Sequence, residues 1–347
     1  MKRWMTLAAT LAAGAALAAA APKPEMKAVL DKLGSLNPKP LPQLTAVEAR
    51  KQPTPADAVK AVLIERGMST KPEEVAKVQD VKIAGAEGKI AARIYTPAGA
   101  GAMPVVVYFH GGGWVIANLD VYDSSPRALA NLTKAIIVSV EYRQGPEHKF
   151  PAAHEDAFAA YQWVLENAAS FGGDPARVAV AGESAGGNLA AAVSLMARER
   201  KAPMPRAQLL VYPIAGYDFD TASYTENATA KPLDKAGMKW FFEQYLNSPQ
   251  DAQDPRISLV NADLHGLPPT TIITAQLDPL RSEGQLLATN LKMAGVKVDS
   301  KSYDGVTHEF FGMGAVVPEA KEAEQFGAEG LRKALKASPK PMGRSAK

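Results

Sequence analysis

Short apolar runs alternate with longer amphipathic stretches along most of the chain. Residues 105–109 form one such run without a polar position, as expected for a strand buried on both faces. Further strand candidates are residues 135–140, 178–181, 208–212, 271–275 and 296–303. Helical stretches between them are residues 123–132, 152–167, 188–201 and 283–294. This alternation predicts an α/β protein with a mostly parallel central sheet and helices on both faces.

The region before the first buried run has a different pattern. Residues 78–83 and 90–95 are strand candidates separated by Gly85 and Gly88, which predicts a hairpin. Upstream, the chain is polar and rich in proline, with helical fragments at residues 26–33, 46–51 and 55–66. These fragments are too short to fold alone, so we expect them to pack on the rest of the molecule.

The strand and helix alternation is interrupted at residues 217–260, where a helical pattern at 234–247 is rich in aromatic residues. We interpret this stretch as an insertion that packs with the N-terminal helices to form a cap. The expected organisation is a signal peptide at 1–20, N-terminal cap helices at 21–74, a catalytic core at 75–216 and 261–335, a cap insertion at 217–260, and a basic disordered tail at 336–347.

The N-terminus has the pattern of a secretory signal peptide. Lys2 and Arg3 precede an alanine-rich apolar run at residues 4–21 that ends in small residues. We expect cleavage near Ala20, which would export the protein to the periplasm or the medium without stable membrane insertion. The competing interpretation is an uncleaved membrane anchor, because the run is about long enough to span a bilayer, although alanine inserts weakly.

Composition limits the classes of protein and partner. The content of 47% hydrophobic and 22% charged residues is ordinary for a soluble globular protein. The net charge of +3 is too small to indicate a nucleic-acid partner. With no cysteine in the chain, a cysteine nucleophile, a thiolate–zinc site and disulfide bonds are excluded.

The strongest chemical signal is the sequence Gly-Glu-Ser-Ala-Gly-Gly at residues 182–187, which lies between a predicted strand and a predicted helix. A sharp turn there would raise Ser184 above the carboxyl edge of the sheet, and the flanking glycines would avoid collisions with neighbouring backbone. The helix that follows would point its first N–H groups at an oxyanion. The alternative is a glycine-rich turn in which Ser184 only caps the helix.

A second signal, His-Gly-Gly-Gly-Trp at residues 110–114, also follows a predicted strand. Three consecutive glycines are costly in conformational entropy, so they favour a loop whose backbone N–H groups approach a ligand. In esterases such a loop supplies oxyanion donors together with the residue after the nucleophile, here Ala185. The alternative is a merely flexible loop.

A serine nucleophile needs a base, and the chain has five histidines. His110 belongs to the glycine loop, and His265 looks like part of a surface loop. We expect His148 and His154 to be solvated or locally hydrogen-bonded. His308 follows the last strand candidate and a predicted turn at Asp304-Gly305, so it is our candidate base.

The third member of a triad should end a strand between the serine and the histidine in chain order. Asp278 fits this position, after residues 271–275 and directly before Pro279. The same pattern is typical of a helix N-cap, and both roles can coexist.

With these motifs in this order, the chain resembles the hormone-sensitive-lipase-like family of α/β-hydrolases, the bacterial esterase and lipase group. The resemblance spans about residues 104–313 and includes Glu-Tyr-Arg at 141–143, the segment 146–153 and Asp-Pro-Leu-Arg at 278–281. It implies an α/β-hydrolase fold with a helical cap and no metal or organic cofactor. The implied roles are Ser184 as nucleophile, Asp278 as orienting acid, His308 as base, and Gly112, Gly113 and Ala185 as oxyanion donors.

The chain departs from the family pattern at several positions near these motifs. Glu183 stands where the family usually has Asp, Ser282 replaces an acidic residue, and Glu309 replaces a glycine. Gln144-Gly145 replaces a Leu-Ala pair. We expect none of these to touch the triad or the donors, and we expect Ser282 and Glu309 to alter surrounding hydrogen bonds or the shape of the pocket.

The expected activity is hydrolysis of short- to medium-chain carboxylic esters of small molecules through an acyl-enzyme. Two alternatives stay open at this point. One is an amidase or peptidase that uses the same triad. The other is a secreted, non-catalytic binding protein on a hydrolase scaffold.

Overall fold

The computed structural model describes residues 21–336. The predicted signal peptide at 1–20 lies outside the described residues. So does the predicted basic tail, apart from its first residue, Lys336, which is the last residue of a helix.

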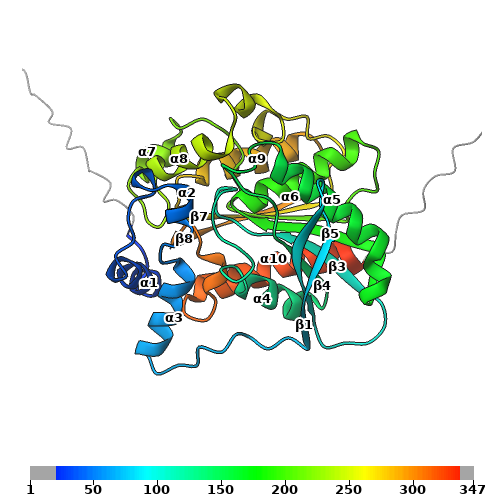
Figure 1. Cartoon of the computed structure of the whole chain (residues 1–347), viewed down its shortest axis with the longest axis horizontal. Helices are drawn as coiled ribbons and strands as arrows, with labels where there is room; N and C mark the ends of the chain where they lie inside the picture. The colour runs from blue at the N-terminus through cyan, green and yellow to red at the C-terminus, as the bar shows by residue number, and fades with distance from the viewer. Residues whose placement is uncertain (1–20, 337–347) are drawn as a thin grey trace, which may run out of the picture.

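Within residues 21–336 the strands form one eight-stranded sheet, in the order β1-β2-β4-β3-β5-β6-β7-β8 (Figure 1). β1 and β2 are the predicted antiparallel hairpin, β2 pairs antiparallel with β4, and the other neighbours are parallel. The strands are β1 Lys77–Ala84, β2 Lys89–Thr96, β3 Met103–Phe109, β4 Ile136–Val140, β5 Gly173–Glu183, β6 Gln208–Val211, β7 Thr270–Leu277 and β8 Val298–Thr307. The mostly parallel α/β sheet is therefore confirmed.

Helices cover both faces of the sheet. Buried residues of α5, α6 and α9 share one hydrophobic cluster, and those of α1, α3, α4 and α10 share the cluster on the opposite face. The helices are α1 Pro24–Ser35, α2 Ala46–Ala49, α3 Pro55–Glu65, α4 Ser124–Thr133, α5 Ala152–Asn167, α6 Ala185–Glu199, α7 Ala222–Glu226, α8 Lys235–Tyr245, α9 Arg281–Met293 and α10 Pro318–Lys336. Short 3₁₀ turns are η1 Leu41–Gln43, η2 Ala168–Phe171, η3 Pro249–Gln253, η4 Leu259–Asn261 and η5 Phe311–Met313.

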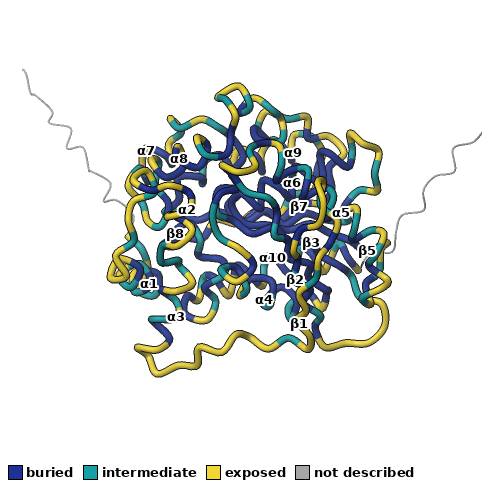
Figure 2. The backbone as a smooth tube through the Cα atoms, in the orientation of Figure 1, coloured by how far each residue is buried: buried dark blue, intermediate teal, exposed yellow. Residues whose placement is uncertain are grey.

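The central strand β3 explains why its sequence lacks polar alternation. Val105, Val107 and Phe109 belong to one cluster, whereas Val106 and Tyr108 belong to the other. Each of these side chains is at most 1% exposed, and burying such a side chain contributes about 1.5–3 kcal/mol. Figure 2 shows the same pattern, with buried backbone in the middle of the molecule and exposed backbone at its outer loops.

Two predicted boundaries are wrong in ways that affect the site. Helix α6 begins at Ala185, three residues earlier than predicted, because the turn that carries Ser184 leads directly into it. The predicted turn at Asp304-Gly305 lies instead inside β8. Gly305 has φ 71°, and the pairing with β7 shifts register between Ala275 and Leu277, so the strand continues through an irregularity.

Residues 217–260 contain α7, α8, η3 and η4 and no strand. Helix α8 contacts η1 from the N-terminal region, and the Trp240 indole N–H donates to the Leu44 carbonyl at 3.2 Å. In Figure 1 these two parts of the chain, far apart in sequence, lie together above one end of the sheet.

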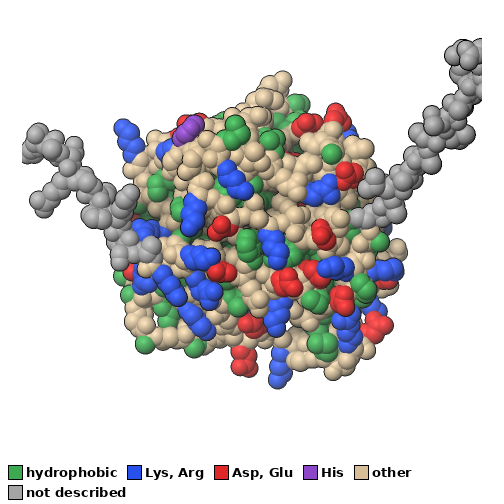
Figure 3. Space-filling model, turned by 180° about the vertical axis from the view of Figure 1, so that it is seen from behind, with side chains coloured by type: hydrophobic (Ala, Val, Ile, Leu, Met, Phe, Trp, Pro, Cys, Tyr) green, Lys and Arg blue, Asp and Glu red, His purple; other side chains and the backbone are tan. Residues whose placement is uncertain are grey.

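The outer surface carries charges of both signs. Figure 3 shows lysine and arginine side chains interspersed with aspartate and glutamate over one face, which agrees with the small net charge. Within residues 21–336, no helix is both long and apolar enough to cross a bilayer.

Two glycine-to-alanine substitutions test how tightly α6 approaches β3. A Cβ on Gly186 would lie 1.9 Å from the Phe109 carbonyl oxygen, whereas a Cβ on Gly34 in α1 would meet nothing within 4 Å. We predict that Gly186→Ala lowers the free energy of unfolding by at least about 1–3 kcal/mol. Gly34→Ala should instead stabilise the protein by up to about 1 kcal/mol, because alanine favours the helix.

Chemical denaturation monitored by circular dichroism measures both changes. Equal effects of the two substitutions would contradict the close contact at Gly186.

Candidate active site

The candidate residues gather at the carboxyl edge of the parallel strands. His110 follows β3, Ser184 follows β5, Asp278 follows β7 and His308 follows β8. Parallel strands end at the same edge of a sheet, and ligands of open α/β sheets bind there. The topology therefore brings together residues that are up to 198 positions apart in the sequence.

Ser184 lies on a strained turn. Its φ of 56° and ψ of −119° place it outside the usual regions for a non-glycine residue, at a cost of about 1–3 kcal/mol. The turn is possible because Gly182 and Gly186 have no side chains, and a Cβ on Gly182 would lie 2.1 Å from the Gly186 oxygen. Hydrogen bonds hold the Ser184 backbone, with its N–H donating to Val211 and its carbonyl accepting from Asn188. The interpretation of Ser184 as a simple helix cap is wrong, because its side chain makes no cap hydrogen bond.

Ser184, His308 and Asp278 form one hydrogen-bonded chain. His308 Nε2 lies 2.9 Å from Ser184 Oγ, and His308 Nδ1 lies 2.7 Å from Asp278 Oδ2. The three residues are between 0 and 3% exposed. With the Nδ1 proton directed at the carboxylate, Nε2 is left to accept the serine proton, which is the arrangement that activates a serine nucleophile.

The surroundings of His308 act on its pKa in opposite directions. Burial lowers the pKa of the imidazole, while the Asp278 carboxylate raises it through its charge and its hydrogen bond, and Glu309 and Glu183 raise it further. The net result is a pKa above the ordinary histidine value. The carboxylates therefore stabilise the imidazolium form of His308.

Asp278 is not the helix N-cap that its sequence also suggested. Helix α9 has Leu280 at its N-cap position, without a side-chain cap. Asp278 Oδ1 instead accepts the Leu280 N–H at 2.8 Å, which fixes the carboxylate and leaves Oδ2 for the histidine.

Hydrogen bonds with residues of the insertion hold the turn that carries Asp278. The Ser223 and Ser282 backbone N–H groups each donate to the hydroxyl of the other residue, at 3.1 and 3.0 Å. The Ser223 hydroxyl donates to the Pro279 carbonyl, and the Asn227 amide donates to the Asp278 carbonyl. The departure at Ser282 thus links α7 of the insertion to the acid-bearing turn.

The glycine loop lies beside Ser184. Gly112 and Gly113 have φ of 95° and 59°, and a Cβ on Gly113 would lie 2.2 Å from the Phe241 ring. Neither of their N–H groups has an acceptor within residues 21–336. Ala185 is the first residue of α6, where a helix leaves its N–H groups unpaired. The departure at Gln144 supports this loop, because its amide donates to the Ile116 and Ala117 carbonyls.

The remaining histidines do not reach Ser184. His110 is buried in the glycine loop and stacks on Tyr142, and His265 is an exposed residue near Asp263. His148 is exposed at the rim of the cavity, as expected. The expectation for His154 is wrong, because this residue is fully buried and bonded to Asn188 and to Tyr245 of α8. Its role is to join α5 to α6 and to the insertion.

Glu183 forms a buried support under the site. Its carboxyl oxygens accept the Tyr108 and Tyr212 hydroxyls, both at 2.5 Å. Burial raises the pKa of the Glu183 carboxyl to about 7. The centroids of the Tyr212 and His308 rings lie 4.5 Å apart, so Glu183 holds in place an aromatic ring that lies beside His308.

The expectation that no departure touches the triad is wrong for Glu309. Its Oε1 lies 3.8 Å from His308 Nε2, and the Tyr122 hydroxyl lies 2.6 Å from both of its carboxyl oxygens. Sequence reasoning did not identify Tyr122 as a residue of this site. Tyr122 and Glu309 are 187 positions apart in the sequence, and only the folding of the chain brings them together.

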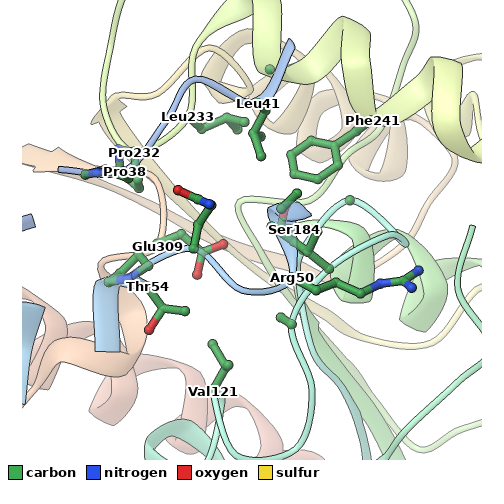
Figure 4. A pocket seen from close by; sticks show the side chains of 18 of the residues that line it. Pro38, Leu41, Arg50, Thr54, Val121, Ser184, Pro232, Leu233, Phe241 and Glu309 are labelled. Carbon is green, nitrogen blue, oxygen red and sulfur yellow. The ribbon is translucent and has the colours of Figure 1, made fainter. Parts of the chain in front are cut away.

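The site opens into a cavity of about 890 Å³. Ser184 and His308 lie on its floor with Gly112 and Gly113, and its walls come from both the N-terminal region and the insertion, as Figure 4 shows for Leu41, Leu233 and Phe241. A concave, mostly apolar space with a few converging polar groups is typical of a small-molecule site. Within residues 21–336, no group of three or more histidine or acidic side chains could hold a metal ion.

The pKa of His308 provides a direct test of this geometry. We predict that Asp278→Asn lowers the pKa of His308, because the lowering effect of burial stays while the largest raising effect is removed. Titration by NMR of isotope-labelled protein measures the pKa. Asp299→Asn, at an exposed position on β8, is the matched control and should leave it unchanged. An unchanged His308 pKa in Asp278→Asn would contradict the observed contact.

Comparison with known proteins gives an independent view of the chain. Residues 106–312 match the model of a family described by the alpha/beta hydrolase fold. Carboxylesterase NlhH of Mycobacterium tuberculosis is 41% identical over 293 residues, which cover 82% of this chain and 92% of that protein. The ethyl acetate hydrolase of Pseudomonas putida is 33% identical over 304 residues, which cover 85% of this chain and 92% of that protein.

Solved structures agree with the sequence comparison. A hyperthermophilic esterase from the archaeon Pyrobaculum calidifontis superposes with a TM-score of 0.82 at 38% identity, over 90% of this chain and 98% of that one. The family match covers more than half of the chain. The relatives named above are esterases, and each matches this chain over nearly its whole length. The chain therefore belongs to the hormone-sensitive-lipase-like esterase family of the α/β-hydrolases and is a carboxylesterase.

Proposed function

We propose that this carboxylesterase hydrolyses esters with short to medium acyl chains through an acyl-enzyme on Ser184. The observation that carries the proposal is the continuous hydrogen-bonded chain from Ser184 through His308 to Asp278, of which Ser184 and His308 line the cavity. No other histidine among residues 21–336 is bonded to a serine hydroxyl.

Each residue then has one role in the reaction. His308 takes the Ser184 proton as the hydroxyl attacks the ester carbonyl, and it returns that proton to the leaving alcohol. Asp278 keeps the imidazole oriented and stabilises its charged form. The N–H groups of Gly112, Gly113 and Ala185 hold the tetrahedral oxyanion. Water then attacks the acyl-enzyme by the same steps and releases the acid.

The size of the cavity and the position of the insertion above it support a preference for short and medium acyl chains. Phe241 of α8 lies against Gly113, so the insertion closes directly over the oxyanion loop. The cavity lies within the range of about 300–1,000 Å³ that is usual for small-molecule sites. The relative from Pseudomonas putida is named for hydrolysis of ethyl acetate, a short-chain ester.

A series of p-nitrophenyl esters tests the activity and the chain length together. We predict that kcat/KM is highest between acetate and octanoate and falls for palmitate. The Ser184→Ala variant should lose activity by a factor of at least about 10³ with every ester, and its fold should be checked by circular dichroism. Full activity in the alanine variant would contradict the role of Ser184, and a maximum at palmitate would contradict the chain-length proposal.

We also propose that residues 1–20 are an export signal, on the basis of the Lys2-Arg3 start and the alanine-rich run after it. Cell fractionation and intact mass measurement after expression of the whole gene in a Gram-negative host test this. The expected product is a periplasmic or secreted protein that has lost about its first 20 residues. A full-length mass in the cytoplasmic fraction would contradict export, and a full-length mass in the membrane fraction would indicate the anchor instead.

A further inference from the structure

Glu309 has a backbone conformation that favours glycine. Its φ is 69°, in the left-handed region, where a long side chain is strained. Strain of this kind persists where the surrounding structure imposes it, and it concentrates at functional sites. Because Glu309 directly follows His308, this backbone conformation determines where the Glu309 carboxylate lies relative to His308, the proposed catalytic base.

The Glu309 carboxylate is held in place and faces the cavity. The Tyr122 hydroxyl is within hydrogen-bond distance of both carboxyl oxygens, and the side chain is 20% exposed. Figure 4 shows it projecting into the cavity, in this view between Ser184 and Thr54. A fixed carboxyl group on the cavity wall can interact with bound substrate.

The charge of Glu309 is not paired with a basic side chain. Among residues 21–336, no lysine or arginine lies within ion-pair distance of it, and its one histidine neighbour is His308. Two basic side chains that line the same cavity are already paired, because Arg50 pairs with Glu147 and Lys231 pairs with Asp234. Burial raises the pKa of the Glu309 carboxyl, whereas the neighbouring His308 and the hydrogen bond from Tyr122 favour its ionised form.

The position of Glu309 identifies the part of the substrate that it faces. His308 Nε2 returns the proton to the leaving alcohol, so the alcohol oxygen must come within about 2.6–3.2 Å of Nε2. Glu309 Oε1 lies 3.8 Å from the same nitrogen. The first atoms of the alcohol part of the ester therefore pass beside the Glu309 carboxylate, whereas the acyl part is fixed by Ser184 and the oxyanion loop.

We propose that Glu309 determines specificity for the alcohol part of the substrate and favours esters of positively charged amino alcohols over neutral and anionic ones. This inference rests on the proposed serine esterase mechanism. A carboxylate with no basic partner attracts a cation that takes the place of the leaving alcohol, and it repels an anion there. Tyr122 acts as a positioning residue, because its hydroxyl fixes the carboxylate.

The test uses esters that share one acyl group and differ in the charge of the alcohol. Butyrylcholine is the cationic probe, 3,3-dimethylbutyl butyrate is its neutral isostere, and 4-butyryloxybutanoate is the anionic probe. In the wild type at pH 8, kcat/KM for the cation should exceed that for the isostere by about tenfold or more, and the anion should be the poorest substrate. The ratio of two esters within one variant cancels effects on folding and on the triad.

Three variants identify the cause of the preference. In Glu309→Gln, which keeps the size of the side chain, the ratio of cation to isostere should fall to about one. Glu309→Gly should give the same ratio while it removes the backbone strain. Tyr122→Phe should reduce the ratio only in part, because the carboxylate remains but is less fixed. Ethyl hydrogen succinate, with its charge on the acyl side, is the control and should show a smaller change in Glu309→Gln than the anionic alcohol ester.

The inference is overturned if the wild type shows no preference between the cation and its isostere, or if Glu309→Gln keeps the wild-type ratio. It is also overturned if the succinate ester responds as strongly as the anionic alcohol ester. Hydrolysis of p-nitrophenyl butyrate separates these results from failure of the mechanism. Activity on that ester without a charge preference rejects the role of Glu309 alone, whereas no activity on it rejects the proposed function.

Discussion

The contact between the start of α6 and the end of β3 is the constraint on which the site depends. At Gly186 there is room only for a hydrogen atom beside the Phe109 and His110 carbonyl oxygens. This approach allows the sharp turn at Ser184, and it places the glycine loop that follows β3 next to Ser184. The proposed nucleophile and the proposed oxyanion donors are therefore positioned by one backbone contact between the start of α6 and the end of β3.

Further contacts join the insertion and the N-terminal region to the residues around Ser184. The insertion reaches the acid-bearing turn through Ser223, the glycine loop through Phe241, and the buried His154 through Tyr245. The N-terminal region contacts the insertion through the Leu44 carbonyl, which accepts a hydrogen bond from Trp240. Because the same segments both enclose the cavity and support the triad, the shape of the substrate pocket and the alignment of the catalytic residues are coupled.

Local sequence patterns predicted the elements and the triad, because each depends on a few consecutive residues. The apolar run of β3, the glycines around Ser184 and the strand that precedes Asp278 all act over short distances. The partners of Glu309, Glu183 and His154 could not be predicted in this way. Tyr122, Tyr212 and Asn188 reach them only through the folded sheet, and no spacing along the chain reports such a contact. The irregularity in β8 was missed because Asp304-Gly305 is also typical of a turn.

The central claim is that Ser184 is the residue that forms the covalent intermediate. The most direct test is to treat the folded protein with a fluorophosphonate, which reacts with activated serines, and to locate the adduct by mass spectrometry of peptides. The account predicts a single adduct on the peptide that contains Ser184 and none in Ser184→Ala. A folded wild-type protein that forms no adduct, or one that carries it on another serine, would contradict the account.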